Sequence, residues 1–398
     1  MENTFAPFPN QRDVLKLSLS QRNFARDMYL KLARSSPGNI FFSPFTIMTA
    51  LGMVYSGAQR TTEQEMKTVM NLSQDRISLH RAFKDVITDF QKKGGPFELC
   101  TSNIAYVPDS VQLLPNYKAI LSNTYQSYAK SGNFRKPELV REEINNTVKS
   151  QTNSRILEIM PEGVIDEDLK ILLVNVVYFK GLWEKEFVSH TTEGIFWLSE
   201  EENIKVPMMH ISESFDMVHH KDLGATVLSM DYKGSRLSML IVLPLERDGL
   251  SEIEAKMADM DLGDLEKAMD SCKIAVSLPR FKMLETIHLT DLLIEMGMKD
   301  LFNEKSSDLS GITGNRQLFI SQVIHKYFLE VNETGTEAAA ATCTPTLCTS
   351  CFDVLIYVLL IKKPRPPNFI ADHPFMFFIR DQLSGLVLFI GRLTNPTA

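Results

Sequence analysis

The sequence predicts an α+β fold in which helices come early in the chain and strands come late. In the first third, apolar residues recur every three or four positions, which is the spacing of a helix face. In the second half, short apolar runs end at prolines or polar turns, as strands do. Helices and strands that are segregated along a chain, rather than alternating, are typical of α+β proteins.

Three segments have the pattern of a helix. Residues 20–34 carry an apolar stripe, and Ser20 stands where a helix cap would lie. Residues 79–90 carry a second stripe, which the glycines and proline of 94–96 would end. A third helical stripe runs through residues 251–269. These segments supply the helical layer of the predicted fold.

Five segments have the pattern of a strand. Residues 237–243 and 274–278 each end at a proline, and residues 318–330 alternate before a loop. Residues 375–379 and 386–390 flank a polar turn and predict a hairpin. Because several of these runs are apolar without a break, we expect strands that are buried on both faces.

Composition and charge exclude several classes of protein. The 398 residues carry 42 Lys+Arg against 49 Asp+Glu, a net charge of -7, so there is no basic footprint for nucleic acid. The longest apolar run, Val354–Ile361, is far shorter than the about 20 residues of a membrane helix. The first residues lack the basic start and apolar core of a signal peptide. We expect no nucleic-acid or membrane binding and a cytoplasmic or leaderless protein, with an extracellular location left open.

The sequence contains no recognisable enzyme motif. Nucleophile-elbow, phosphate-loop, dinucleotide and zinc-helix patterns do not occur. The eight histidines show no metal-ligand spacing, and the adjacent pair His219 and His220 is typical of a solvated turn. We therefore expect no catalytic activity, no cofactor and no metal.

Two further clusters admit a functional and a structural interpretation. The basic residues Arg81, Lys84, Lys92 and Lys93 could bind a polyanion such as a glycosaminoglycan, but acidic residues interrupt them and favour a solvated helix face. Cys348 and Cys351 form a C-x-x-C pair, yet a strand-like run follows them where a redox motif would have a helix.

Residues 333–342, ETGTEAAAAT, have a composition that suits a segment able to insert into a β-sheet. They follow a strand pattern, and Gly335 marks the junction as a hinge. A segment that is small and uncharged at every second position can slide between two strands at low steric and desolvation cost. Alternation would point four residues inward, namely Thr336, Ala338, Ala340 and Thr342. It would point three outward, namely Glu337, Ala339 and Ala341.

At this point the chain resembles the serpins, from about residue 20 to residue 396. The resemblance rests on ordered blocks such as NIFFSPFTI, LVNVVYFKGLWEKEF, LPRFKM, ADHPFMFFI and LFIGRLTNP. It implies one domain over 20–398, preceded by an extension over 1–19, with three β-sheets and eight or nine helices. It also implies an exposed reactive-centre loop at about 336–368 and a monomer.

The resemblance implies inhibition by trapping. A serine protease attacks the loop, an acyl-enzyme forms, and the cut loop inserts into the large sheet before water releases the protease. Ser43, Thr46, Asn175 and His325 match the family's shutter, with Thr46 where serine is usual, and Trp183 matches its breach. The rival interpretation is a non-inhibitory binding or storage protein, or a protease substrate.

In the serpins the residue before the reactive bond falls 16 places after the hinge glutamate, here Glu333, so the resemblance implies a bond between Thr349 and Ser350. A small β-branched residue before the bond favours an elastase-like protease. A shifted register through Leu347, Cys348 or Phe352 would favour a chymotrypsin-like enzyme. A third group of alternatives suits a trypsin-like enzyme and consists of Lys362, Lys363 and Arg365.

The loop departs from the family in length, and three cysteines, Cys343, Cys348 and Cys351, lie beside the departing stretch. Ser350 and Pro374 are 24 positions apart, about a dozen more than in the family, which leaves a genuine insert, a splice form and a gene-model artefact as alternatives for 351–367. Cys348 and Cys351 flank the predicted bond, so their oxidation could make inhibition redox-sensitive; three unrelated thiols are the alternative.

Overall fold

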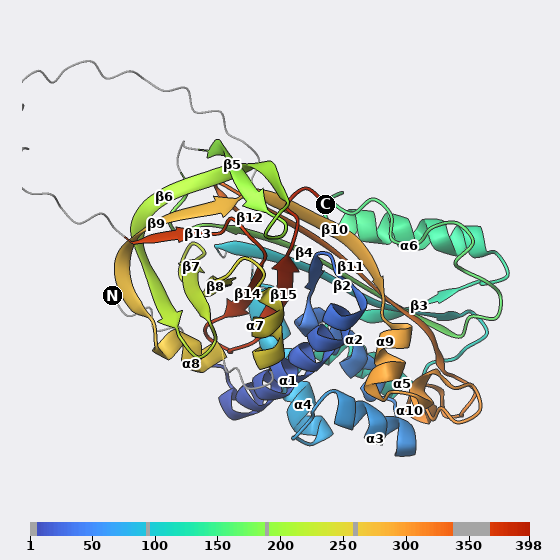
Figure 1. Ribbon diagram of the computed structural model, residues 1–398. Helices are drawn as coiled ribbons and strands as arrows, with labels where there is room; N and C mark the ends of the chain where they lie inside the picture. Colours follow the sequence, from blue (N-terminus) through green and yellow to red (C-terminus); the bar gives the residue numbers. More distant parts are fainter. Residues whose placement is uncertain (1–5, 93–95, 188–190, 258–261, 337–366) are drawn as a thin grey trace, which may run out of the picture.

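The computed structural model describes residues 6–92, 96–187, 191–257, 262–336 and 367–398 (Figure 1). Within them, ten α-helices lie in this order: α1 (Gln11–Ser35), α2 (Pro44–Tyr55), α3 (Arg60–Val69), α4 (Arg76–Phe90), α5 (Pro115–Thr124), α6 (Pro137–Gln151), α7 (Leu250–Lys256), α8 (Leu262–Lys267), α9 (Thr290–Met296) and α10 (Ser310–Thr313). A 3-10 turn, η2 (Asp300–Phe302), follows α9.

Two hydrogen-bonded ladders form the strand layers. The six-stranded sheet comprises β2 (Phe97–Pro108), β3 (Tyr128–Gly132), β4 (Ile171–Leu182), β10 (Phe281–His288), β11 (Ile320–Asn332) and β12 (Gly335–Thr336). The nine-stranded ladder comprises β1 (Ile40–Phe42), β5 (Thr191–Trp197), β6 (Asn203–His220), β7 (Ala225–Asp231), β8 (Leu237–Pro244), β9 (Asp270–Pro279), β13 (Asn368–Ile370), β14 (Phe375–Asp381) and β15 (Val387–Leu393).

The long strand β6 joins two sheets within the nine-stranded ladder. Its first part pairs with β5, and its last part, Asp216–His220, pairs with β7. One sheet continues from β7 through β8, β14 and β15 to β1, and the other contains β5, β9 and β13. Together with the six-stranded sheet, this gives three sheets, of which the two in the ladder share β6.

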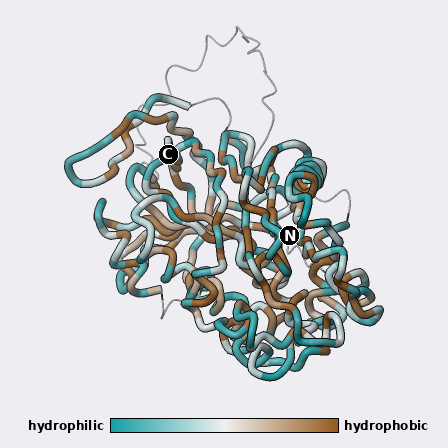
Figure 2. Tube along the Cα trace, turned by 90° about the vertical axis from the view of Figure 1, so that its right-hand side faces the viewer, coloured by the Kyte–Doolittle hydropathy of each residue, from teal (hydrophilic) through white to brown (hydrophobic). Residues whose placement is uncertain are grey.

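The six-stranded sheet has an apolar core on each face. On one face, α2 packs beneath the sheet with all twelve of its residues buried. On the other face, α6 covers the sheet through Val140, Ile144 and Val148. Figure 2 shows hydrophobic residues along the inner strands and hydrophilic residues along the outer loops. Strands β8, β14 and β15 are buried at every position, as their unbroken apolar sequences predict.

Three local predictions need correction. Ser20 does not cap a helix, because α1 begins at Gln11 and Ser20 is buried inside it. The single helix predicted over 251–269 is represented by two helices, α7 and α8. His219 and His220 end strand β6 rather than forming a turn, and His219 hydrogen-bonds Thr226 on the neighbouring strand. The second predicted helix, the five strands and the C-terminal hairpin are confirmed.

Candidate functional site

The predicted hinge begins inside the six-stranded sheet. Strands β4 and β11 are parallel and pair directly from Ile171 opposite Ile320 to Tyr178 opposite Phe328. Beyond that point β12 lies between them and is antiparallel to both, with Thr336 opposite Gly181 and Val331. The chain therefore turns back from β11 after Asn332 and enters the gap at the end of the β4–β11 pair.

Gly335 fits this gap because it has no side chain. Its φ is +153°, and a Cβ there would lie 2.1 Å from the carbonyl oxygen of Gly181 and 2.6 Å from the Cα of Leu182. Both contacts are to backbone atoms, which cannot turn aside as a side chain can. The position predicted as the hinge from sequence is thus one that admits only glycine.

Aromatic residues hold the first residues of the hinge. Thr336 is completely buried, and its hydroxyl hydrogen-bonds the Tyr232 hydroxyl at 2.8 Å. The Tyr232 ring stacks on Trp183 with centroids 4.6 Å apart. Trp183 in turn donates from its indole to the carbonyl of Asn332 and from its backbone to that of Thr334. The turn before β12 is therefore fixed from the side of β4.

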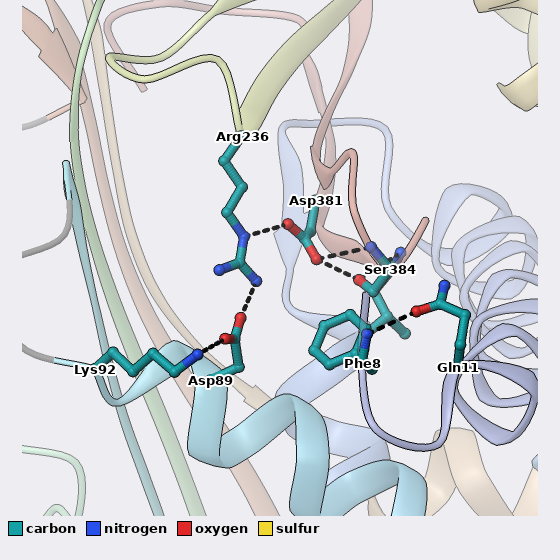
Figure 3. A network of polar contacts seen from close by, with 8 residues as sticks. Phe8, Gln11, Asp89, Lys92, Arg236, Asp381 and Ser384 are labelled. Carbon is teal, nitrogen blue, oxygen red and sulfur yellow. Dashed lines mark hydrogen bonds and ion pairs between the residues drawn. The ribbon is translucent and has the colours of Figure 1, made fainter. Parts of the chain in front are cut away.

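A largely buried arginine, Arg236, anchors the turn that carries Tyr232. Figure 3 shows Arg236 between two carboxylates, with its Nε donating to Asp381 at 2.8 Å and its Nη2 paired with Asp89 at 2.5 Å. Asp381 is completely buried and also accepts from the backbone and hydroxyl of Ser384. This network ties the β7–β8 turn to the end of α4 and to the β14–β15 turn.

Glu333 connects the start of the hinge to the neighbouring sheet. Its carboxylate accepts hydrogen bonds from Thr191 and from Arg280. Burial raises the pKa of Glu333, but the hydrogen bonds from Thr191 and Arg280 outweigh it, so the pKa lies below its usual value. Since the Arg280 side chain is half exposed, this ion pair contributes little to the stability of the hinge.

Three polar side chains form a row across the middle of the six-stranded sheet. Asn103 on β2 lies opposite Asn175 on β4, which lies opposite His325 on β11. The Asn175 amide donates to Asn103, and its carbonyl accepts from Nδ1 of His325 and from the Thr46 hydroxyl. We call Asn103, Asn175 and His325 the polar row.

The polar row rests on the start of helix α2. The backbone N–H of Ser43 donates to Nε2 of His325 at 3.2 Å, so the ring proton lies on Nδ1. The Ser43 hydroxyl donates to the carbonyl of Leu388 and accepts from the N–H of Thr46, which caps α2. Complete burial lowers the pKa of His325 to about 3, so the ring is neutral at physiological pH.

The structure thus brings Ser43, Thr46, Asn175 and His325 together, and places Trp183 beside the hinge. Sequence reasoning missed Asn103, Tyr232 and Arg280. A polar residue in the apolar stretch of β2 was a signal for Asn103, but its partner depends on strand register. The remaining predicted residues lie outside the described residues: Glu337, Ala338, Ala339, Ala340, Ala341, Thr342, Leu347, Cys348, Thr349, Ser350, Cys351, Phe352, Lys362, Lys363 and Arg365.

Two of the basic residues near α4 have acidic partners. Arg81 pairs with Asp13 at 3.0 Å, and Lys92 pairs with Asp89 at 2.5 Å. Within the described ranges, His, Cys, Asp and Glu form no group that could hold a metal ion. In the same ranges, no helix is both long and apolar enough to cross a membrane.

Comparisons with known proteins agree over nearly the whole chain. Residues 19–396 match the family described as "Serpin (serine protease inhibitor)". The leukocyte elastase inhibitor of Bos taurus is 38% identical over 390 residues, which cover 96% of this chain and 100% of that protein. Serpin B4 of Homo sapiens is 37% identical over 401 residues, which cover 95% and 100%. The crystal structure of Serpin48 from Tenebrio molitor is 28% identical, with a TM-score of 0.84 and coverage of 96% and 98%.

Proposed function

The chain belongs to the serpin family, and from this premise we propose that it traps serine proteases covalently by inserting its cleaved loop between β4 and β11. The predicted family and fold class are confirmed by the match over residues 19–396 and by the structural neighbours. Relatives named as elastase inhibitors support protease inhibition rather than catalysis as the activity.

One observation carries the insertion step. Gly335 and Thr336 already pair with Leu182 and Gly181 in the antiparallel sense that an inserted strand needs. If that register continues, residue 346 comes to lie opposite Ile171, the first residue of β4. The segment 337–346 then fills the gap, with Ala338, Ala340 and Thr342 on the same face as Thr336.

The polar row is the contact that insertion must break. His325 and Asn175 join β11 to β4 directly, and a strand between them would separate the two side chains. In the continued register Thr342 lies opposite Asn175. Its hydroxyl can donate to Asn175 and accept from Nδ1 of His325, which replaces the lost hydrogen bond and avoids two buried unsatisfied groups.

The chemistry of the trap is the protease's own. The protease serine attacks the carbonyl carbon of Thr349, the peptide C–N bond breaks, and the amine of Ser350 leaves with a proton. An ester now joins the two proteins, and water would hydrolyse it if the protease stayed intact. Insertion pulls the esterified Thr349 along the sheet, so the serpin supplies a substrate and a metastable fold but no catalytic group.

The elastase-like preference rests on Thr349 and on relatives named leukocyte elastase inhibitor. Chymotrypsin-like cleavage remains the alternative through Leu347, Cys348 or Phe352, and trypsin-like cleavage through Lys362, Lys363 or Arg365. Oxidation of the Cys348 and Cys351 thiols to a disulfide, with two electrons and two protons passing to an external oxidant such as a low-molecular-weight disulfide, would close a small ring around the reactive bond and suppress inhibition. Equal inhibition with and without reductant would contradict this redox step.

Incubation with one elastase-, one chymotrypsin- and one trypsin-like protease tests the proposal. We expect an SDS-stable complex with the elastase-like enzyme, and a released peptide that begins at Ser350. Cleavage without a complex by all three enzymes would instead favour the substrate or storage alternative.

A further inference from the structure

Tyr232 is joined to the hinge by a single, fully buried contact. Its hydroxyl and that of Thr336 are 2.8 Å apart, and both residues are completely buried. Burial raises the pKa of Tyr232, so the phenol keeps its proton and can donate. A hydroxyl pair in such surroundings is worth more than one in water, since neither group can turn to solvent.

The residues around the Tyr232 ring leave room for it to reach Thr336. Gly181 faces the Tyr232 ring, where a Cβ would lie 2.7 Å from a ring carbon. The ring is held on its other side by Trp183, at an angle of 15°. Gly181 thus leaves room for the Tyr232 ring, and Gly335 lets β12 pair closely with β4 beside it.

The backbone of Tyr232 is fixed independently of the hinge. Its N–H donates to the carbonyl of Leu237, and the next residue, Lys233, donates to the carbonyl of Leu182 at the end of β4. Arg236 clamps the same turn between Asp381 and Asp89. Tyr232 is therefore held in place beside the gap by contacts that do not involve the hinge. The hinge residue that it contacts, Thr336, begins the segment that inserts in the proposed function.

We propose that the Tyr232 hydroxyl is a positioning group that keeps Thr336 docked as the first rung of the inserting strand. This inference rests on the proposed function. In the continued register Thr336 stays opposite Gly181, so the hydrogen bond is present both before and after insertion. Insertion then extends an existing strand, which avoids the entropic cost of bringing the first residues of a free loop into the sheet.

A docked Thr336 affects whether the protease is trapped, because it sets how soon insertion begins after cleavage. After the acyl-enzyme forms, insertion competes with hydrolysis of the ester, and a slower start favours hydrolysis. Losing one neutral hydrogen bond changes an equilibrium about fivefold, which corresponds to about 1 kcal/mol. We expect the number of turnovers per stable complex to rise by about that factor when either hydroxyl is removed.

The test uses Tyr232→Phe, Thr336→Val and the double variant in the full chain. Tyr327→Phe is the matched control, because Tyr327 is a buried tyrosine of the six-stranded sheet whose hydroxyl donates to Glu285 at 3.0 Å rather than to a residue of the hinge. Thr336→Ser keeps the hydroxyl and should behave as wild type. The two readouts are amide hydrogen exchange of residues 333–336 in the uncleaved protein and the stoichiometry of inhibition of an elastase-like protease.

We expect faster exchange and about fivefold more turnover in each single variant, and no further loss in the double variant, because removing both partners leaves no unsatisfied hydroxyl. Tyr327→Phe should change neither readout. Unchanged exchange in Tyr232→Phe, or an equal effect of Tyr327→Phe, would overturn the proposal. Exchange needs no protease, so a wild-type protein that inhibits nothing would refute the proposed function while the exchange result still decides the role of Tyr232.

Discussion

His325 gives the sheet a dependence on pH that belongs to one side chain. Burial lowers its pKa to about 3, whereas an unfolded histidine has a pKa of about 6.5. Between these values only the unfolded chain binds the proton, so the free energy of unfolding falls as pH falls. The slope for one proton is about 1.4 kcal/mol per pH unit, and the stability is fully present only above about pH 6.5.

We predict that melting temperatures measured from pH 7.5 to pH 5 fall less steeply in His325→Gln than in wild type. His219→Gln is the control, since His219 is exposed. Part of the slope will remain in His325→Gln, because burial and the charge of Arg76 also lower the pKa of His80, to about 4. Parallel slopes for wild type and His325→Gln would show that His325 is protonated or solvated in the folded protein.

Gly335 offers a second test at a single residue. Alanine there would push a Cβ against the backbone of Gly181, and overpacking of this kind costs roughly 1–3 kcal/mol. We expect Gly335→Ala to expel β12, speed amide exchange at residues 333–336 and convert the protein from inhibitor to substrate. Gly38→Ala is the control, because a Cβ at Gly38 meets no heavy atom within 4 Å. Full inhibition by Gly335→Ala would mean that a docked hinge is dispensable.

At the scale of elements, unbroken apolar sequences were sufficient to predict the buried strands, because a strand covered on both faces has no polar position to interrupt it. Helix ends were harder to predict. Ser20 resembles a cap, but Val14 and Leu17 continue the buried stripe of α1 toward the N-terminus, and tertiary packing extends the helix past the serine. Local capping preference is worth less than the burial of two apolar side chains.

The β7–β8 turn is the element whose rigidity we expect to matter most. Arg236→Gln would leave the buried carboxylate of Asp381 without its cation and Asp89 with Lys92 alone, and breaking a buried ion pair costs about 3–5 kcal/mol. We predict a melting temperature lower by roughly 5 °C. The exposed pair of Lys205 with Glu193 supplies the control, and Lys205→Gln should leave the melting temperature unchanged. If Arg236→Gln has the melting temperature of the wild type, the stability of the turn does not depend on Arg236.

At the scale of the whole molecule, the sequence and its family resemblance could predict the class of fold and four residues that the structure brings together, Ser43, Thr46, Asn175 and His325, but not how they meet. The row of Asn103, Asn175 and His325 exists because three strands far apart in the chain share one register. A one-residue slip would send each side chain to the opposite face, and a single sequence does not specify register. The same reason hid Tyr232, which reaches the hinge from a turn of another sheet.

Under the proposed mechanism, we expect the length of the loop to decide whether a cut traps the protease. In the register continued from Thr336, the gap beside β4 ends at about residue 346, so a protease esterified to Thr349 is drawn close to the far end of the sheet. An enzyme that cuts after Lys362 holds a tether 13 residues longer, which at about 3.3 Å per residue is roughly 43 Å of slack. Such an enzyme would not be distorted and would hydrolyse its ester.

We therefore predict opposite outcomes for two proteases acting on the same loop. An elastase-like enzyme should give an SDS-stable complex, whereas a trypsin-like enzyme should cut after Lys362, since Lys363 and Arg365 are each followed by proline, and dissociate. Both cut forms should melt at much higher temperature than the intact protein, since insertion needs only a free end, and this separates insertion from trapping. A deletion of residues 351–361 should shorten the tether to the basic residues and convert the trypsin-like enzyme from a consumer of the loop into a trapped target. The trypsin-like enzyme could still cleave the deletion variant without forming a complex, while the elastase-like enzyme still forms one. In that case tether length does not decide the outcome, and the geometry of the bond within each protease's active site decides it instead.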